Sequence, residues 1–185
     1  MLVTELDLAI DVGRHLDGVG ARWCIGGSVA SSLLGVPRAT LDVDLVADLR
    51  RPHVAPLCAA LIGEYYVDED TCRWAVDTRR SFNAIHHATM IKIDVFCAKD
   101  DALSRAELTR RLFLDIGGRS VPVCSPEDII LQKLLWFVAA GGSERQWNDA
   151  LGVVQTRRDE LDRRYLDEHA EPLGLAELLA RLLSA

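Results

Sequence analysis

Alternation of apolar and polar residues predicts two short β-strands in the first half of the chain. In the run from Leu41 to Leu45, the leucines and Val43 point to one face, and Asp42 and Asp44 point to the other. The run from Ile91 to Phe96 alternates in the same way and places Asp94 among its polar positions. Because aspartate is disfavoured inside strands, we expect Asp94 to have a specific role.

Other segments of the first 124 residues have the spacing of helices or further strands. We expect a helix from Thr4 to about Gly18 and another that begins at Pro52. Gly117 and Gly118 have the turn chemistry of a β-hairpin between two five-residue strands. The strands expected in this region are Trp23–Ile25, Tyr65–Val67, Trp74–Val76, Ser81–His87, Leu112–Ile116 and Arg119–Val123.

The pattern becomes helical after Val123. Ser125 as N-cap, Pro126 at the first helical position and two acids after it indicate a strong helix start. Further helices are expected from about Glu144 to Glu160 and from Leu173 to Leu183. We therefore expect one α/β (α+β) domain over residues 1–185, with a short mixed sheet flanked by helices in residues 1–124 and a helical C-terminal section, residues 125–185, packed on it.

A glycine turn joins the predicted strand Trp23–Ile25 to an apolar helical stretch, Val29–Leu34. Gly26 and Gly27 allow backbone N–H groups to approach a ligand, and the start of a helix favours a phosphate. Ser28 can cap the helix or contact a phosphate oxygen. A simple tight turn also explains this sequence. The closeness of the Asp42 strand makes a triphosphate site the more specific hypothesis.

The three aspartates form a candidate metal site. Asp42 and Asp44 on one strand face repel each other unless a cation lies between them, and Mg²⁺ binds through one or two carboxylates plus substrate phosphates. If the Asp94 strand lies beside the Asp42 strand, the three carboxylates can hold two Mg²⁺ ions. The alternatives are a solvated strand face for Asp42 and Asp44, and an exposed edge strand with an ion pair for Asp94.

These residues resemble the DNA polymerase beta-like nucleotidyltransferase superfamily over roughly residues 20 to 150. The matching motifs are Gly26-Gly27-Ser28, Asp42-Val43-Asp44 and the distant Asp94, and the chain looks most similar to small bacterial members related to AbiEii-type toxins. The run Ser125-Pro126-Glu127-Asp128, Lys133, and residues 145–149 are similar to the family's later helical motifs. The resemblance implies that Lys133 contacts the nucleotide and that Asp149 is an accessory polar residue. A solvated lysine is the alternative for Lys133.

The resemblance implies a reaction as well. Such proteins transfer a nucleoside monophosphate from an NTP such as ATP to an acceptor hydroxyl. Asp42 and Asp44 are then expected to hold the metal on the triphosphate, with Asp94 as ligand of a second metal or as the base, and Gly26, Gly27 and Ser28 contact the phosphates that leave as pyrophosphate. The same likeness includes a toxin role with a partner antitoxin. A catalytically degenerate protein that binds a nucleotide or a partner as a regulatory module is the alternative.

Composition limits the cellular setting and the partners. The chain has 185 residues, 49% of them hydrophobic, and contains neither a membrane-spanning apolar run nor a secretory signal, so we expect a cytoplasmic protein. Its five cysteines are widely spaced without a Cys-x-x-Cys pair and are interpreted as buried apolar residues. A net charge of -7 gives no general attraction to nucleic acid. Local arginine pairs leave RNA open as the acceptor, equally with a protein or a small molecule.

Overall fold

The computed structural model describes residues 4–40 and 42–185, and the chain forms two compact units. The first unit contains the residues up to Val29 and Thr40–Val123, and the second contains Ala30–Ala39 and Cys124–Ala185. The boundary after Val123 coincides with the predicted change to helix. The sequence pattern did not indicate that residues 30–39 belong with the C-terminal helices. Leu41, part of a predicted strand, lies outside the described residues.

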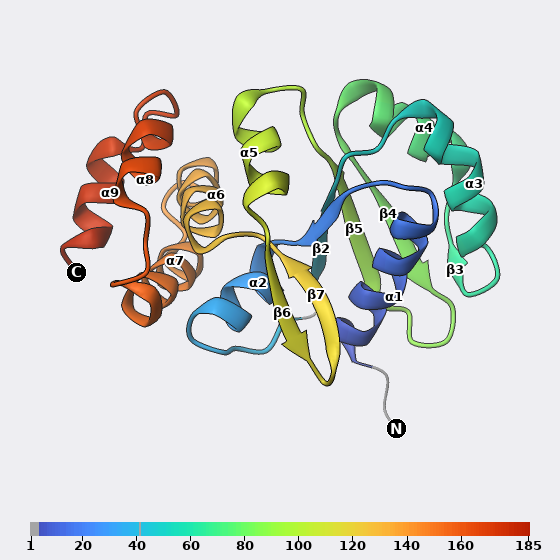
Figure 1. Cartoon of the computed structure of the whole chain (residues 1–185), viewed down its shortest axis with the longest axis horizontal. Helices are drawn as coiled ribbons and strands as arrows, with labels where there is room; N and C mark the ends of the chain where they lie inside the picture. The colour runs from blue at the N-terminus through green and yellow to red at the C-terminus, as the bar shows by residue number, and fades with distance from the viewer. Residues whose placement is uncertain (1–3, 41) are drawn as a thin grey trace. The chain divides into compact units, whose positions relative to one another are not determined.

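The first unit is built on a mixed sheet. Its strand order is β3-β4-β5-β2-β1-β7-β6. The pairs β2–β5 and β1–β7 are parallel, whereas the other neighbouring strands are antiparallel. The strands are β1 (Trp23–Ile25), β2 (Val43–Ala47), β3 (Tyr65–Tyr66), β4 (Ser81–His86), β5 (Lys92–Cys97), β6 (Leu112–Ile116) and β7 (Arg119–Val123). Figure 1 shows this sheet with the β6–β7 hairpin predicted around the two glycines.

Helices cover one face of this sheet. Helix α1 contacts β1, β2 and α3, α3 contacts α4, and α4 contacts β4. The helices of this unit are α1 (Glu5–Gly18), α3 (Arg51–Leu61), α4 (Glu69–Thr78) and α5 (Ala102–Arg110), and α2 (Gly27–Leu34) begins in it. The helix predicted from Thr4 to about Gly18 is present as α1, and Thr4 caps it by accepting a hydrogen bond from the Asp7 backbone N–H.

The register shows which side chains point toward α1. A Cβ on Gly13 of α1 would lie 2.1 Å from the Trp23 ring, so Trp23 packs directly on this helix. Trp23 pairs with Ala47 of β2, and cross-strand partners share a face. The fully buried Val43 and Leu45 therefore belong to the helix-covered face, and Asp44 points to the opposite face.

The strand predicted at Trp74–Val76 is wrong, because these residues lie in α4. Asp68 starts this helix by accepting a hydrogen bond of 2.7 Å from the Thr71 backbone N–H. Trp74 is 55% exposed, while Ala75 and Val76 are buried. The aromatic and β-branched residues that favour a strand locally are therefore overridden by a capped amphipathic helix.

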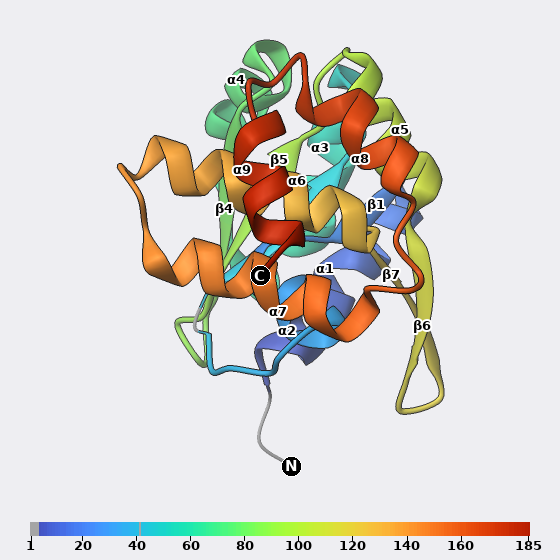
Figure 2. The ribbon, with the colours of Figure 1, turned by 90° about the vertical axis from the view of Figure 1, so that its left-hand side faces the viewer.

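The second unit is helical. Its helices are α6 (Pro126–Ala139), α7 (Glu144–Arg157), α8 (Arg163–Ala170) and α9 (Ala176–Leu183), seen at the yellow-to-red end of the chain in Figure 2. Helix α6 packs on α7 and α8, and α9 packs on α7 and α8. Ser125 caps α6 as predicted, accepting a hydrogen bond from the Asp128 N–H. In the described part of the chain, no helix combines the length and the apolar character that crossing a bilayer requires.

Candidate functional site

Parallel pairing of β2 and β5 brings Asp44 and Asp94 side by side. The register aligns Val43 with Ile93 and Asp44 with Asp94. Strand β5 lies between β4 and β2, so the edge position expected in the alternative for Asp94 is wrong. The ion pair expected in the same alternative is present, between Lys92 and Asp94. Asp42 precedes β2 by one residue and is exposed. The structure thus joins two segments that are 50 positions apart in the printed sequence, as the hypothesis required.

Two polar side chains hold the Asp94 carboxylate. Asn83, its register partner on β4, donates a hydrogen bond of 2.7 Å from Nδ2 to Oδ1. The Lys92 Nζ lies 2.6 Å from Oδ2. The Asp94 side chain is 16% exposed, so these donors replace most of the water that an ionised carboxylate would otherwise bind. Lys92 lies in the alternating run Ile91–Phe96 that predicted this strand, whereas Asn83 was missed because nothing in its own segment marks it.

The pKa of Lys92 is affected by all three carboxylates. Its hydrogen bond to Asp94 raises the pKa of the Lys92 ammonium above its usual value, against partial burial, which lowers it. The charges of Asp94, Asp42 and Asp44 raise it further. All three carboxylates therefore favour the charged form of the Lys92 ammonium.

The glycine turn directly adjoins this acid cluster. The Gly26 N–H donates a hydrogen bond of 2.9 Å to the Asp44 carbonyl oxygen. Gly27 has a φ of +55°, and a Cβ there would lie 1.7 Å from Asp44 Oδ2. Only glycine allows both this backbone conformation and this approach of the carboxylate. Ser28 lies in the first turn of α2 and is 7% exposed.

The second unit buries an ion pair between Lys133 of α6 and Asp149 of α7. The Lys133 Nζ lies 2.7 Å from Asp149 Oδ2, and their side chains are 4% and 6% exposed. The solvated-lysine alternative is therefore wrong. Arg38 forms a bidentate contact with the same carboxylate: its Nε donates to Asp149 Oδ1 at 2.6 Å, and its Nη2 donates to Oδ2 at 2.8 Å. The sequence offered no signal for Arg38, which is separated from Asp149 by 111 positions.

Burial and hydrogen bonding act in opposite directions on Asp149. Burial raises the pKa of its carboxyl group, but the hydrogen bonds and charges of Arg38 and Lys133 outweigh it and hold the pKa below its ordinary value. The carboxylate is thus ionised at neutral pH. Contact of Lys133 with a nucleotide stays a prediction.

A hard divalent cation suits the donor set formed by Asp42, Asp44 and Asp94. Carboxylate oxygens are the side-chain ligands that Mg²⁺ prefers. The ion pair of Lys92 with Asp94, at 2.6 Å, shows that a positive group already lies against one of these carboxylates. The carboxylates of these three residues could hold the metal.

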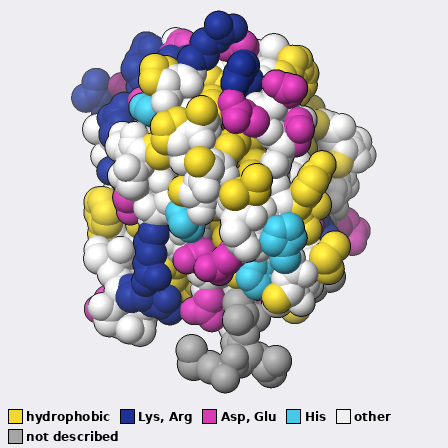
Figure 3. All heavy atoms as spheres, turned by 90° about the vertical axis from the view of Figure 1, so that its right-hand side faces the viewer, with side chains coloured by type: hydrophobic (Ala, Val, Ile, Leu, Met, Phe, Trp, Pro, Cys, Tyr) yellow, Lys and Arg dark blue, Asp and Glu magenta, His cyan; other side chains and the backbone are white. Residues whose placement is uncertain are grey.

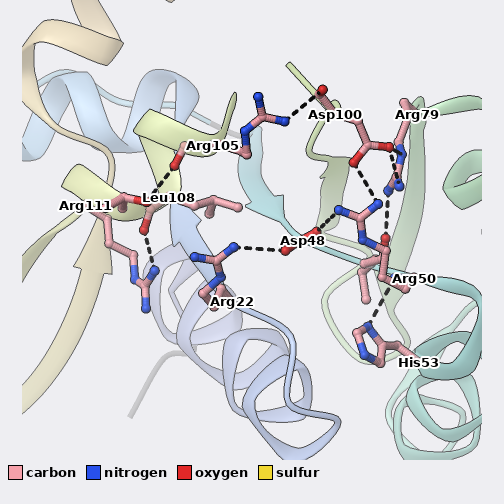
Figure 4. Close-up of polar contacts among 11 residues, drawn as sticks. Arg22, Asp48, Arg50, His53, Arg79, Asp100, Arg105, Leu108 and Arg111 are labelled. Carbon is pink, nitrogen blue, oxygen red and sulfur yellow. Dashed lines mark hydrogen bonds and ion pairs between the residues drawn. The ribbon is translucent and has the colours of Figure 1, made fainter. Parts of the chain in front are cut away.

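Several arginines of the first unit are paired with carboxylates at the other end of β2 and β5. Arg50 and Arg79 both contact Asp100, each at 2.8 Å, and Arg50 also contacts Asp48 (Figure 4). Arg51 binds Asp77 at 2.6 Å. On the face seen in Figure 3, basic side chains lie in separate groups with acidic ones beside them. These arginines are therefore engaged in pairs within the protein, which weakens the case for a polynucleotide groove there.

Of three comparisons with known proteins, only the search of solved structures finds matches. No protein-family model matches the chain, and no curated protein matches its sequence. Among solved structures, the antibiotic-resistance factor ANT(2'')-Ia is similar with a TM-score of 0.61 and 17% identity, covering 97% of this chain and 99% of that protein. An antigenic nucleotidyltransferase-like protein from Paracoccidioides brasiliensis is similar with a TM-score of 0.53 and 17% identity, covering 96% and 90%.

A third structure, the lincosamide antibiotic adenylyltransferase LnuA bound to lincomycin, has a TM-score of 0.54 and 14% identity, covering 82% of this chain and 96% of that protein. The Paracoccidioides protein is described as nucleotidyltransferase-like and LnuA as an adenylyltransferase. Another structure of ANT(2'')-Ia is described as a complex with adenylyl-2''-tobramycin. The chain therefore has the nucleotidyltransferase fold, as the sequence resemblance implied. The closer relation to AbiEii-type toxins stays a prediction.

Proposed function

We propose that this nucleotidyltransferase fold carries an active, Mg²⁺-dependent enzyme that transfers a nucleoside monophosphate from an NTP to an acceptor hydroxyl. The observation that supports this most directly is the alignment of Asp44 with Asp94 on adjacent parallel strands, with the Asp44 carboxylate against Gly27. Phosphoryl transfer depends mainly on positioning and on stabilising negative charge, and rigid strands supply the positioning.

In this reaction the acid cluster and the glycine turn would have different roles. Asp42 and Asp44 would hold Mg²⁺, which when bound neutralises charge on the triphosphate. Asp94 would act as a further ligand or accept the proton of the acceptor hydroxyl, and Asn83 orients its carboxylate through the 2.7 Å hydrogen bond. The Gly26–Ser28 turn would bind the phosphates that leave as pyrophosphate, because the start of α2 favours negative charge.

The acceptor is a hydroxyl of an RNA, a protein or a small molecule. One related structure is described as a complex of ANT(2'')-Ia with adenylyl-2''-tobramycin, and another as lincomycin-bound. Both descriptions concern hydroxylated small molecules, which makes this class the first to test here. The net charge of -7 gives no general attraction to a polynucleotide.

The direct test is incubation of the full chain with each α-labelled NTP and Mg²⁺, together with aminoglycosides, lincosamides, total RNA or total protein. We expect pyrophosphate release and labelling of one acceptor class. Asp44→Asn and Asp94→Asn should lower the rate by about a hundredfold or more, because removing even groups that only support a metal ligand costs 10–100-fold. Asp70→Asn is the matched control, since Asp70 is an exposed acid on α4. Equal rates in parent and all three variants would refute the proposal.

One observation favours a second function. The Lys92 ammonium already lies 2.6 Å from Asp94, so the acid cluster is partly neutralised by the protein itself. That arrangement is compatible with a regulatory module that binds nucleotide or a partner without catalysis. Calorimetry separates the two functions: nucleotide binding that is the same with and without Mg²⁺ and never yields pyrophosphate supports the module.

A toxin role with a partner antitoxin is the remaining part of the proposal, supported by the sequence resemblance alone. If it is correct, expression should arrest growth, and Asp42→Ala should relieve the arrest. Growth unaffected by expression of the parent protein would exclude this role without affecting the enzymatic proposal.

A further inference from the structure

A pocket lies in the first unit, away from the acid cluster. Its volume is about 310 Å³, at the lower end of the range for sites that bind small molecules. It is lined by α1, by β1, by the β6–β7 hairpin and by Arg111, which lies between α5 and β6. Arg14 of α1 and Arg119 of β7 are also in its walls. Three guanidinium groups around one small pocket are unexpected in a chain whose net charge is -7.

The pocket and the acid cluster lie on opposite faces of the sheet. Trp23 lines the pocket and packs on α1. Its register partner is Ala47, which shares a face with Leu45 and Val43, whereas Asp44 points away from α1. A ligand in this pocket would therefore contact neither Asp44 nor Asp94, and the pocket is separate from the proposed nucleotide site.

Two of the three arginines have hydrogen-bonding capacity left. Arg119 is paired with Asp7 at 3.0 Å. Arg14 is exposed and forms no hydrogen bond or ion pair with any other residue in the described ranges 4–40 and 42–185. Arg111 donates from one terminal nitrogen to the Leu108 carbonyl oxygen (Figure 4). Its Nε is buried and has no partner among those residues, a state that costs free energy unless a ligand supplies an acceptor.

The acids in and beside the pocket cancel only part of this positive charge. Asp17 accepts a hydrogen bond of 2.9 Å from Trp23 Nε1, which directs its carboxylate toward the indole ring. Asp7 is occupied by Arg119 and by its capping contact with Thr4. Asp7 neutralises Arg119, and Asp17 can neutralise one further arginine. Of the three arginine charges, one positive charge therefore remains.

An aromatic surface adjoins the guanidinium groups. Phe113 on β6 is 60% exposed, and the Arg111 guanidinium carbon lies 5.4 Å from the centre of its ring. Val121 and Pro122 of β7 add apolar wall. A flat ring could stack beside Phe113 while an anionic group attached to that ring reaches the arginines.

We propose that this pocket binds a small organic anion in which a phosphate or carboxylate is attached to a flat ring. Arg14 and Arg111 bind the anionic group, and Phe113 contacts the ring. The inference does not depend on the proposed nucleotidyl transfer, because none of the residues involved belongs to the acid cluster.

Calorimetric titration of the full chain at low salt tests the proposal with phenyl phosphate, benzoate and inorganic phosphate as probes. We expect phenyl phosphate or benzoate to bind, and whichever binds more tightly identifies the anionic group. Arg14→Gln and Arg111→Gln should each weaken binding about tenfold or more, since a hydrogen bond to a charged group is worth about that factor. Phe113→Leu should weaken binding of phenyl phosphate but leave that of inorganic phosphate unchanged.

Two control variants make the result specific. Arg164→Gln removes an arginine whose side chain is 87% exposed on α8, and Asp44→Asn alters the acid cluster; both should leave phenyl phosphate affinity unchanged. The circular dichroism spectrum of each variant checks that it is folded. The proposal is overturned if no probe binds the parent, if Arg14→Gln and Arg111→Gln bind as the parent does, or if Asp44→Asn abolishes binding.

Discussion

Gly27 links backbone conformation to the chemistry of the acid cluster. Its φ of +55° is costly for any other residue, and the Asp44 carboxylate occupies the space that a Cβ would need. The two constraints act on one residue but have different consequences. The first affects the stability of the fold, whereas the second affects the position of a proposed metal ligand.

Substitution at Gly27 can separate these consequences. Gly27→Ala should displace the Asp44 carboxylate and lower nucleotidyl transfer by about tenfold or more, with a stability loss of about 1–2 kcal/mol from the left-handed backbone. Gly117→Ala is the matched control, because Gly117 has a φ of +62° and nothing within 4 Å of the added Cβ. Rates and unfolding free energies of both variants are the measurement. If the two variants lose the same activity, the Gly27–Asp44 contact has no special role.

Lys92 provides a test of whether the acid cluster selects cations. Lys92→Met removes the ammonium from the three carboxylates, whose mutual repulsion then lowers the melting temperature in the absence of metal. Millimolar Mg²⁺ should restore more stability to this variant than it adds to the parent, because the ion no longer competes with Lys92. The measurement is thermal denaturation with and without Mg²⁺.

Lys99→Met is the control for Lys92→Met, since Lys99 is an exposed lysine outside the strands. It should respond to Mg²⁺ as the parent does. Equal Mg²⁺ effects on the parent and on Lys92→Met would argue against a divalent site at Asp42, Asp44 and Asp94.

At the scale of elements, a few long-range pairings bring the important side chains together. The β2–β5 register aligns the acids, and the Lys133–Asp149 ion pair connects α6 with α7. Breaking a buried pair leaves the remaining charge without compensation, which usually costs more than the pair contributed. We therefore expect loss of the Lys133–Asp149 ion pair to lower the unfolding free energy, whether or not Lys133 also contacts a nucleotide.

The lowered pKa of Asp149 predicts a pH-dependent contribution of this pair to stability. The folded state binds the Asp149 proton less readily than the unfolded chain does. The contribution of Asp149 to the unfolding free energy is therefore complete above the ordinary pKa of 3.8, and it is lost as the pH falls through the lower pKa of the folded state. Asp149→Asn should therefore lower the unfolding free energy by about 3–5 kcal/mol at pH 7, with the difference shrinking below about pH 4. Denaturant titrations across this pH range measure it.

Asp159→Asn serves as the comparison for Asp149→Asn, because Asp159 is an exposed acid of the same unit. It should leave the stability close to that of the parent at every pH. A constant difference between Asp149→Asn and the parent from pH 7 to pH 3 would show that the carboxylate is not the titrating group.

At the scale of the whole molecule, the chain separates into two units that each have buried apolar residues. Leu57 of α3 is 1% exposed in the first unit, and Leu166 of α8 is 0% exposed in the second. Units with separate cores can open separately in the native state. The chain passes between them three times, at residues 29/30, 39/40 and 123/124.

Hydrogen exchange can determine whether the units open independently. Leu166→Ala should cost about 2–5 kcal/mol and increase amide exchange in α6–α9 while β2, β4 and β5 keep their protection. Leu57→Ala should have the reverse pattern. Loss of protection throughout the chain in either variant would instead identify one cooperative unit.

Local rules were sufficient for much of the fold. Alternation predicted the faces of β2 and β5, two glycines predicted the β6–β7 hairpin, and Ser125 predicted the start of α6, because these signals depend on sterics and hydrogen bonds within a few residues. The same kind of signal was wrong at Trp74–Val76, where local strand propensity lost to a capped helix.

Three-dimensional packing was required to bring the candidate site together. The sequence pattern identified Asp42, Asp44, Asp94 and the glycine turn as candidate site residues. Only the strand order and register place Asp94 beside Asp44 and Asn83. The Arg38–Asp149 contact and the arginine pocket opposite the acids left no trace in any short window of residues. Such contacts form only when the apolar faces of many helices and strands are buried together. Because this packing involves residues from the whole chain, no single segment predicts it.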